Sequence, residues 1–285
     1  MKFTDLNRHG GIGANCSLLE IGPFRIAIDS GLHPKFAGYD SLPSHDFLER
    51  NSLDFIVLTH CHLDHLGSLP ILSREHPDAP VLLSYASSIL ARRMLSNSVS
   101  VMRRQRSDLN LPELPFYGRG DLTALYDRMK PLSIKTPLQV EKDGKVLKVT
   151  FHHAGHVAGA IAVEFETKNE KIFFTGDLLF NDQRTLDGAE IPTEKFDVLI
   201  TETTRGGTPR DPARQRESEI VSLLEEIRKT LARGGSVLIP VFALGRMQEM
   251  LVQIDEAFRR NAFPKVPVFC SGLGMDLVNH FHEIS

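Results

Sequence analysis

The sequence contains few cysteines and no cysteine pair. Cys16, Cys61 and Cys270 are the only three in a chain of 285 residues, and none of them belongs to a CxxC motif. A disulfide framework and a closed thiolate zinc site both need paired cysteines, so neither kind of site is indicated. Any metal chemistry therefore depends on the 12 histidines and on carboxylates.

The sequence also lacks a long hydrophobic run. No apolar stretch approaches the roughly 20 residues that a membrane span needs. The opening residues MKFTDLNRHGG lack the apolar core of a secretory signal peptide. We therefore expect a cytoplasmic protein with no membrane partner.

An excess of basic residues is absent as well. Lys and Arg together number 33 and Asp and Glu 36, which gives a formal net charge of −3. A nucleic-acid partner would have to be held by a local groove and by bound metals rather than by overall charge. With 41% hydrophobic and 24% charged residues, the chain can bury one large core or two smaller ones.

Strand patterns dominate the first part of the chain. Short β-rich and apolar runs separated by turn residues predict strands, and longer 3.6-residue patterns predict helices. The predicted strands are residues 15–21, 24–29, 55–59, 81–84, 145–153, 160–167 and 172–175. Helical segments are predicted between them at 66–75 and within 85–130.

The rhythm changes after residue 196. Predicted strands at 197–201, 236–241 and 267–270 alternate with predicted helices at 214–233 and 245–260. Alternation at this spacing is typical of a parallel α/β unit. The segment 204–214 is rich in Gly, Pro and Arg, so we expect a first domain over residues 1–205 and a second over 206–285.

The strongest chemical signal is the segment HCHLDH at residues 60–65. His60 and His62 stand two residues apart at a strand end and can point to the same side, while Asp64 and His65 can serve a neighbouring position. This is a layout for two metals, and imidazole with carboxylate suits zinc. A polar loop that happens to hold three histidines is the alternative, but the place between a strand and a helix is the context that such a motif needs. Cys61 is expected to face the core.

This segment is the HxHxDH signature of the metallo-β-lactamase superfamily, and three further segments resemble its other motifs in the right order: Ile28–Gly31 (IDSG), Ala154–Ala160 (AGHVAGA) and Phe174–Asp177 (FTGD). The resemblance implies an α/β fold, the αββα sandwich, with two zinc ions. The residues that it implies for one ion are His60, His62, His156 and Asp177, and those for the other are Asp64, His65 and Asp177.

Two later segments resemble the β-CASP family within this superfamily: Thr201–Thr204 (TETT) and Arg233–Arg246 (RGGSVLIPVFALGR). They look most like the RNA-processing branch, which includes ribonuclease J and the endonuclease subunit of the cleavage and polyadenylation specificity factor. The resemblance implies that residues 206–285 are the first part of an inserted parallel α/β domain. Gly245 and Arg246 open a helix where free N–H groups can receive a substrate phosphate; structural capping is the alternative.

Two departures from the family pattern stand out. Arg205 occupies a position where the family usually has Tyr. The family also continues past this point with a histidine thought to act as general acid and another that completes the second metal site. We therefore expect the chain to be truncated at its C-terminal end, to bind metal and to cleave poorly.

The function implied by the resemblance is that of a zinc-dependent phosphodiesterase, an endoribonuclease that hydrolyses single-stranded RNA through a water bridging two ions. The carboxylates expected in catalysis are Asp64, Asp177, Glu202 and Asp29, the last two as braces for other groups. A homodimer is compatible with the sequence. Two alternatives stay open: a hydrolase of a small-molecule ester or thioester, and a non-catalytic β-CASP partner subunit.

Overall fold

The computed structural model describes residues 1–209, 211 and 215–284. Its first sheet has six strands in chain order: β1 (Lys2–Asp5), β2 (Ser17–Ile21), β3 (Phe24–Ile28), β4 (Phe55–Val57), β5 (Val81–Ser84) and β6 (Met129–Leu132). The first three strands are antiparallel, and β3 to β6 run parallel. The parallel strands therefore deliver their following loops to one edge of the sheet.

The second sheet has the order β11-β10-β9-β8-β7. Its strands are β7 (Leu138–Lys142), β8 (Lys145–His153), β9 (Ile161–Glu166), β10 (Lys171–Phe174) and β11 (Val198–Ile200). All neighbours pair antiparallel except β10 and β11, which are parallel. As a result, the chain leaves β10 and β11 at the same edge.

The two sheets pack face to face over an apolar layer. Phe24 and Phe55 from the first sheet lie in one buried cluster with Phe151 and Phe165 from the second. Alternate strand residues enter this layer, since strand side chains alternate between faces. Full burial of side chains of this size stabilises the fold by about 1.5–3 kcal/mol each, so the sandwich provides a rigid frame for its edge loops.

Helices cover the outer face of the first sheet: α1 (Leu63–Leu66), α2 (Leu69–Glu75), α3 (Tyr85–Asp108) and α4 (Arg119–Arg128). Two 3₁₀ turns, η1 (Gly38–Ser41) and η2 (His45–Phe47), lie in the connection before β4. The side chain of Ser84 accepts a hydrogen bond from the Ser87 N–H and caps α3. Among the described residues, no helix has the length and apolar character needed to cross a membrane.

The outer face of the second sheet is covered differently. Phe173 points away from the inter-sheet core and packs against the tilted ring of Phe196, with ring centroids 4.9 Å apart. Beside them, Lys171 forms ion pairs with Glu164 and Glu194. The α/β class and the two-sheet sandwich are thus confirmed, and the described residues cover this second face with a loop rather than with helices.

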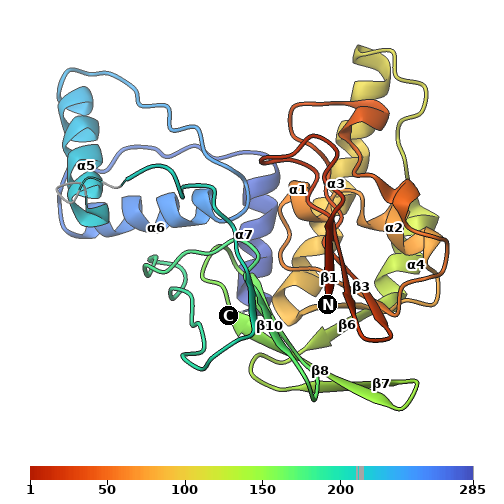
Figure 1. Cartoon of the computed structure of the whole chain (residues 1–285). Coiled ribbons are helices and arrows are strands. Elements are labelled where there is room, and N and C mark those ends of the chain that lie inside the picture. The colour runs from red at the N-terminus through yellow and green to blue at the C-terminus, as the bar shows by residue number, and fades with distance from the viewer. Residues whose placement is uncertain (210, 212–214, 285) are drawn as a thin grey trace.

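Three helices follow the sandwich: α5 (Arg216–Ala232), α6 (Arg246–Arg259) and α7 (Leu273–Ile284). Figure 1 shows α5 and α6 to one side of the sheets, with α7 between α6 and α3. Arg93 of α3 pairs with Asp276 of α7. A small separate cluster is built on Ile227, Ala257 and Phe263, while the domain division at residue 205 stays a prediction. The predicted helix start at residue 214 lies outside the described part of the chain.

The prediction of strands at 236–241 and 267–270 was wrong. Neither segment pairs with another strand in the part of the chain that the structure describes. Leu238 is 91% exposed and Phe269 is 92% exposed, so their apolar side chains face solvent. An apolar, β-branched run favours an extended backbone, but a strand also needs a partner with which to exchange hydrogen bonds.

Candidate metal centre

The candidate site lies where strand ends of both sheets meet. Asp29 follows β3 and His60 follows β4, and these strands are parallel neighbours with Ile28 opposite Val57. In the second sheet, Asp177 follows β10 and Glu202 follows the parallel strand β11. The Ile161 N–H donates to the Thr59 carbonyl at 3.0 Å and joins the two edges. The fold therefore brings together segments that are far apart in the sequence.

Three histidines form the first cluster. The Nε2 atom of His60 lies 3.1 Å from Nδ1 of His62, and Nε2 of His156 lies 3.2 Å from the same Nδ1. One nitrogen from each ring lies within 4.8 Å of the others. Oδ2 of Asp177 lies 3.6 Å from His156 Nε2 and 4.0 Å from His60 Nε2. The four residues expected around one ion thus converge on one point.

A second cluster lies beside the first. His60, His65 and Asp177 also offer ligand atoms within 4.8 Å of one another. Nε2 of His65 lies 3.5 Å from Asp177 Oδ1 and 3.8 Å from Asp64 Oδ2. Asp177 therefore turns one oxygen toward each cluster, which is the arrangement that a carboxylate shared by two cations requires.

Asp29 orients the second cluster through its hydrogen bonds. Its carboxylate accepts hydrogen bonds from the Thr59 N–H, the Thr59 hydroxyl and Nδ1–H of His65, at 2.7, 2.7 and 2.8 Å. Asp29 itself has a φ of 61°, a left-handed conformation that Asp tolerates better than most residues. Gly31 approaches the Asp64 carbonyl so closely that a Cβ would lie 1.7 Å from its oxygen. The IDSG segment is therefore shaped to the HCHLDH segment by direct contact.

Burial sets the protonation of the first cluster. Burial and the neighbouring imidazoles lower the pKa of His60 well below its ordinary value. The same causes lower the pKa of His156 to about 3, and burial lowers the pKa of His62. Neutral imidazole is the form that binds a cation. At neutral pH these three rings are therefore in the form that can coordinate a metal ion.

Carboxylates dominate the second cluster. Burial alone would lower the pKa of His65, but the Asp29 carboxylate, with help from Asp177 and Asp64, raises it to about 9. Burial, followed by repulsion from Glu202, Asp64 and Asp29, raises the pKa of Asp177 to about 6, against the opposite pull of His65. Closely spaced, partly buried carboxylates that repel one another are an environment that a divalent cation stabilises.

Glu202 lies at the rim of this cluster. Its Oε1 accepts a hydrogen bond from the Leu178 N–H at 2.8 Å, and its own N–H donates to the Thr175 hydroxyl at 3.2 Å. It thereby fixes the loop that carries Asp177. Cys61, between two of the candidate ligands, packs in the core with Sγ 3.4 Å from the Ser87 carbonyl oxygen. Burial raises the pKa of its thiol to about 12, as expected for a core residue.

The first turn of α6 approaches the histidines. Nε2 of His62 lies 3.4 Å from the Leu244 carbonyl oxygen. Gly245 has a φ of 89°, and a Cβ there would lie 2.7 Å from Val157, so glycine is required for this approach. The Gly245 N–H already donates to the Gln248 side chain at 2.8 Å. Of the two readings of Gly245, capping is therefore the one that its contacts favour.

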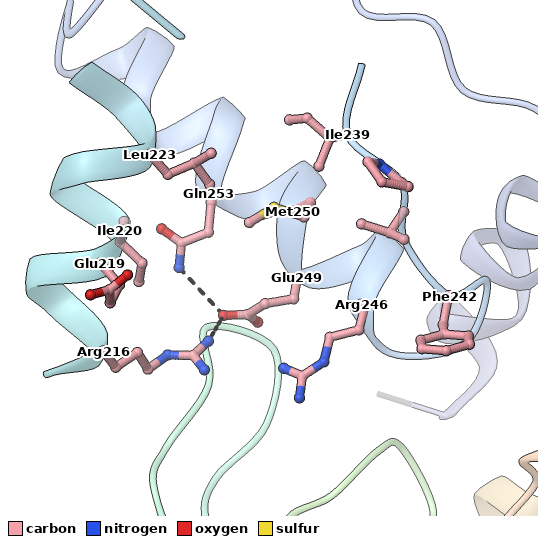
Figure 2. Close-up of a pocket in the computed structure, with 12 residues that line it drawn as sticks. Arg216, Glu219, Ile220, Leu223, Ile239, Phe242, Arg246, Glu249, Met250 and Gln253 are labelled. Carbon is pink, nitrogen blue, oxygen red and sulfur yellow. Dashed lines mark hydrogen bonds and ion pairs between the residues drawn. The ribbon is translucent and has the colours of Figure 1, made fainter. Parts of the chain in front are cut away.

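Arg246 is exposed at the start of α6 and, within the described residues, has no hydrogen-bond or ion-pair partner. Figure 2 shows it beside a pocket of about 700 Å³ between α5 and α6. Its neighbour Glu249 is fully engaged: its carboxylate binds Arg216, Gln253 and the backbone N–H groups of Arg184 and Thr185. Glu249 thus joins α6 to the connection between β10 and β11. Arg246, in contrast, has no partner among the described residues.

Two residues at the site went unnoticed in the sequence. Thr59 holds Asp29 through its N–H and its hydroxyl. Asn15 places its side-chain nitrogen 3.0 Å from Nε2 of His65. The position of Thr59 directly before the HCHLDH segment was a usable signal. Asn15 stands 45 residues before His60 in a glycine-rich loop, and nothing in its local pattern marks it.

Comparison with known proteins agrees with this geometry. The sequence profile of the Metallo-beta-lactamase superfamily matches residues 9–231. The chain belongs to this superfamily. Every residue proposed for the metal centre falls within the matched range.

Curated members of the superfamily resemble most of the chain. Endoribonuclease ysh1 of Schizosaccharomyces pombe is 31% identical over 271 residues, which are 94% of this chain and 34% of that protein. Cleavage and polyadenylation specificity factor 73 of Drosophila melanogaster is 33% identical, over 94% of this chain and 38% of its own length. Integrator complex subunit 11 of Danio rerio is 29% identical, over 100% of this chain and 46% of its own length.

These matches confirm the resemblance to the RNA-processing β-CASP enzymes that the motifs indicate. The chain spans about a third of the length of the endoribonucleases that it matches. Metal binding is the chemistry that this superfamily and the clustered donors share. Neutral imidazoles, shared carboxylate oxygens and near-complete burial of His60 and His65 fit a pair of divalent cations.

Proposed function

We propose that this chain carries the dinuclear zinc centre of an RNA phosphodiesterase that cuts within single-stranded RNA. The observation that carries the proposal is the placement of Asp177, with one oxygen facing His60 and His156 and the other facing His65. Two donor sets that share a carboxylate are typical of two-metal hydrolases acting on phosphodiesters.

The donors divide into two sets. His60, His62 and His156 would hold one ion together with Asp177. Asp64 and His65 would hold the other, again with Asp177. Nitrogen and oxygen donors without thiolate suit zinc at a catalytic centre. When bound, the ions supply Lewis acidity that activates water and stabilises the charge of a phosphodiester under attack.

Asp29 acts on the proton of His65. It accepts Nδ1–H of His65 at 2.8 Å, so Nε2 is the nitrogen that a cation can bind when it displaces the second proton of this ring. This is the orientation that a metal-binding imidazole needs, and a partner of this kind also raises its basicity. Glu202 acts on the Asp177 loop through the Leu178 N–H, so that the shared carboxylate keeps its position.

Arg246 is the residue that we assign to the substrate. Among the described residues it is a cation without a partner, and its charge contributes, after burial and the closer groups, to lowering the pKa of His62 and His156. A guanidinium can bind a phosphate group through two parallel hydrogen bonds. We place Arg246 on a phosphate next to the one that is cleaved.

RNA is the favoured substrate because of the relatives. Two of the matched proteins are named as endoribonucleases or as a cleavage and polyadenylation factor. With a net charge of −3, affinity would come from the local site rather than from overall charge. A homodimer and a cytoplasmic location stay predictions.

The experiment offers three substrates to the full chain under single-turnover conditions with added zinc: an end-labelled single-stranded RNA, the DNA of the same sequence, and a thioester. Single turnover detects even slow cleavage. We expect internal cuts in the RNA that disappear with a chelator and with Asp177→Asn. The control is Asp182→Asn, a carboxylate five residues further along the same connection, which accepts a hydrogen bond from the Gly188 N–H. Faster hydrolysis of the thioester, or no metal-dependent cut in RNA, would contradict the proposal.

A further inference from the structure

Three aromatic rings meet where the loop before β2 contacts the segment after β3. The centroid of the Phe36 ring lies 4.3 Å from that of His9 and 4.4 Å from that of His33. His9 and His33 meet edge to face, with centroids 5.4 Å apart. We call His9, His33 and Phe36 the ring platform. Two segments that are separate in the sequence thus build one aromatic surface.

Hydrogen bonds and close packing orient the platform. Nε2–H of His9 donates to the Asp40 carbonyl at 3.0 Å, and Nδ1 of His33 accepts the Lys35 N–H at 3.1 Å. A Cβ at Gly13 would lie 2.7 Å from the His33 ring, so the loop before β2 packs directly against this ring. The platform therefore has its shape before a ligand binds, which lowers the cost of binding.

Part of the platform is exposed to solvent. Phe36 is 44% exposed and His9 is exposed as well, whereas His33 is buried. A single exposed apolar side chain is ordinary on a protein surface. Three rings in mutual contact, however, offer a surface on which a flat ligand can stack. A nucleobase is such a ligand, whatever its identity, because every base has a π face.

Two cations flank the rings. Arg8 and Lys35 are exposed, and neither side chain has a hydrogen-bond or ion-pair partner in the part of the chain that the structure describes. The only carboxylate in residues 7–13 and 33–40 is that of Asp40. The platform is therefore locally basic in a chain whose net charge is −3. Aromatic rings beside basic side chains are typical of sites that bind single-stranded nucleic acids.

The platform adjoins the second cluster of the metal centre. His33 stands two residues after Gly31, whose backbone contacts the Asp64 carbonyl. Two residues span at most about 7 Å, so the platform begins within about that distance of this contact. Figure 1 shows the N-terminal loop, in red, beside α1, the helix that contains Asp64. Arg246, by contrast, lies beside the first cluster, at the start of the helix that approaches His62.

We propose that the ring platform binds a base of the substrate by stacking, and that Arg8 and Lys35 bind the phosphates next to that base. This rests on the proposed function, because it assumes that the chain binds single-stranded RNA. The strand then extends from Arg246 across the metal centre to the platform, and the base that stacks on Phe36 flanks the bond that is cut. Because stacking tolerates any base, the platform positions the strand without selecting a sequence.

The test compares two fluorescent RNA single strands of equal length and charge. One has normal bases and the other has abasic sites at its internal positions; both contain phosphorothioate linkages, which slow cleavage. Fluorescence anisotropy measures their affinity for the zinc-loaded full chain. We expect Phe36→Ala to weaken the binding of the normal RNA about 5- to 150-fold and to leave that of the abasic RNA unchanged. Phe36→Trp, which keeps an aromatic face, should retain the affinity for the normal RNA.

Phe47→Ala is the matched control. Phe47 lies in the same connection between β3 and β4, is 72% exposed and is not a member of the platform. It should bind both RNAs like the unaltered chain. Thermal unfolding shows whether each variant is folded, and His9→Ala, which removes another ring of the platform, gives a second reading if Phe36→Ala is not.

Lys35→Gln tests the phosphate contact separately. It should weaken the binding of both RNAs alike, because both keep their phosphates, and lower the slope of log K against log salt by about 0.7. An unchanged slope would show that Lys35 binds no phosphate and would overturn this part of the proposal.

The outcomes separate the platform from the proposed function. Equal affinity of Phe36→Ala and the unaltered chain for the normal RNA overturns the stacking role and leaves the RNA hydrolase standing. An equal loss for the two RNAs, or an equal loss in Phe47→Ala, also overturns it, because the effect then does not come from a base on the rings. If the unaltered chain binds neither RNA, the proposed function fails together with the platform.

Discussion

Asp29 and His65 form a buried pair in which Nδ1–H of the imidazole donates to Oδ2 of the carboxylate at 2.8 Å. The side chains are 3% and 5% exposed, so water does not compete for this bond. The pair connects the carboxyl end of β3 to helix α1 and fixes which nitrogen of His65 is free. The tautomer of one candidate ligand is thus set by a residue 36 positions earlier in the chain.

Asp29→Asn should disable the second metal position without removing a ligand. An amide can donate to Nδ1, which moves the imidazole proton to Nε2 and blocks coordination there. We expect the second ion to bind about 10–100-fold more weakly, as for other groups that orient metal ligands. Calorimetric titration with zinc checks this.

Asp54→Asn provides the control, because Asp54 also accepts a backbone N–H, from Arg25, but lies away from the site. Its metal affinity should match that of the unaltered chain. Unchanged binding of the second ion by Asp29→Asn would show that Asp29 only supports the fold.

His156→Ala should remove one donor of the first ion. His60, His62 and Asp177 would remain, so we expect weaker binding of the first ion rather than an unfolded protein. The metal content after dialysis, measured by mass spectrometry, gives the result. His153→Ala, an exposed neighbour at the end of β8, should retain both ions, and an identical loss in the two variants would argue against a specific role for His156.

Arg246→Ala should weaken the binding of single-stranded RNA and make it less sensitive to salt. If Arg246 neutralises one phosphate, the slope of log K against log salt should fall by about 0.7. Fluorescence anisotropy at several salt concentrations measures this slope. Arg259 lies on the same helix but pairs with Asp255. The slope measured for Arg259→Ala should therefore stay that of the unaltered chain. Equal slopes for both variants would exclude the phosphate contact of Arg246.

His45 predicts a pH dependence of stability. It is buried and bound to the Ser30 hydroxyl. Burial, aided by the charges of His76 and Arg8 and opposed by Asp46, lowers its pKa to about 4. Between the unfolded value near 6.5 and this folded value, only the unfolded chain takes up the proton, so stability falls as the pH falls through this window.

His45→Gln should therefore flatten part of the stability profile. Relative to pH 7, the unaltered chain should lose about 2 kcal/mol more than His45→Gln at pH 5. Urea unfolding of the metal-free proteins at both pH values measures the difference. Parallel profiles would mean that His45 titrates alike in the folded and unfolded chain.

The parts of the fold that could be predicted are those with a strong local pattern. The strand β8, Lys145–His153, alternates apolar and polar residues and was predicted with its observed bounds. Three of the four edge strands, β1, β6 and β7, escaped prediction. The strand β6 contains Pro131 and β7 is largely polar, and both lie at sheet edges, where proline is tolerated and a patterned apolar face is not required.

The candidate site was predictable where its residues are adjacent in sequence. The segment at 60–65 contributes four of the proposed donors from one strand end. By contrast, Asn15 reaches the site only because the loop that carries it lies against Asp64. The exposure of Phe269 depends on whether another segment pairs with its own. Contacts of this kind arise from the arrangement of distant elements, which no local pattern encodes.

Imidazoles and carboxylates from both sheets are expected to bind a pair of zinc ions. Anomalous diffraction at the zinc edge, from crystals of the chain grown with zinc, tests it most directly. We predict two peaks about 3.5–4 Å apart, one among His60, His62 and His156 and the other among Asp64, His65 and Asp177. No zinc peak within coordination distance of these side chains would contradict the account.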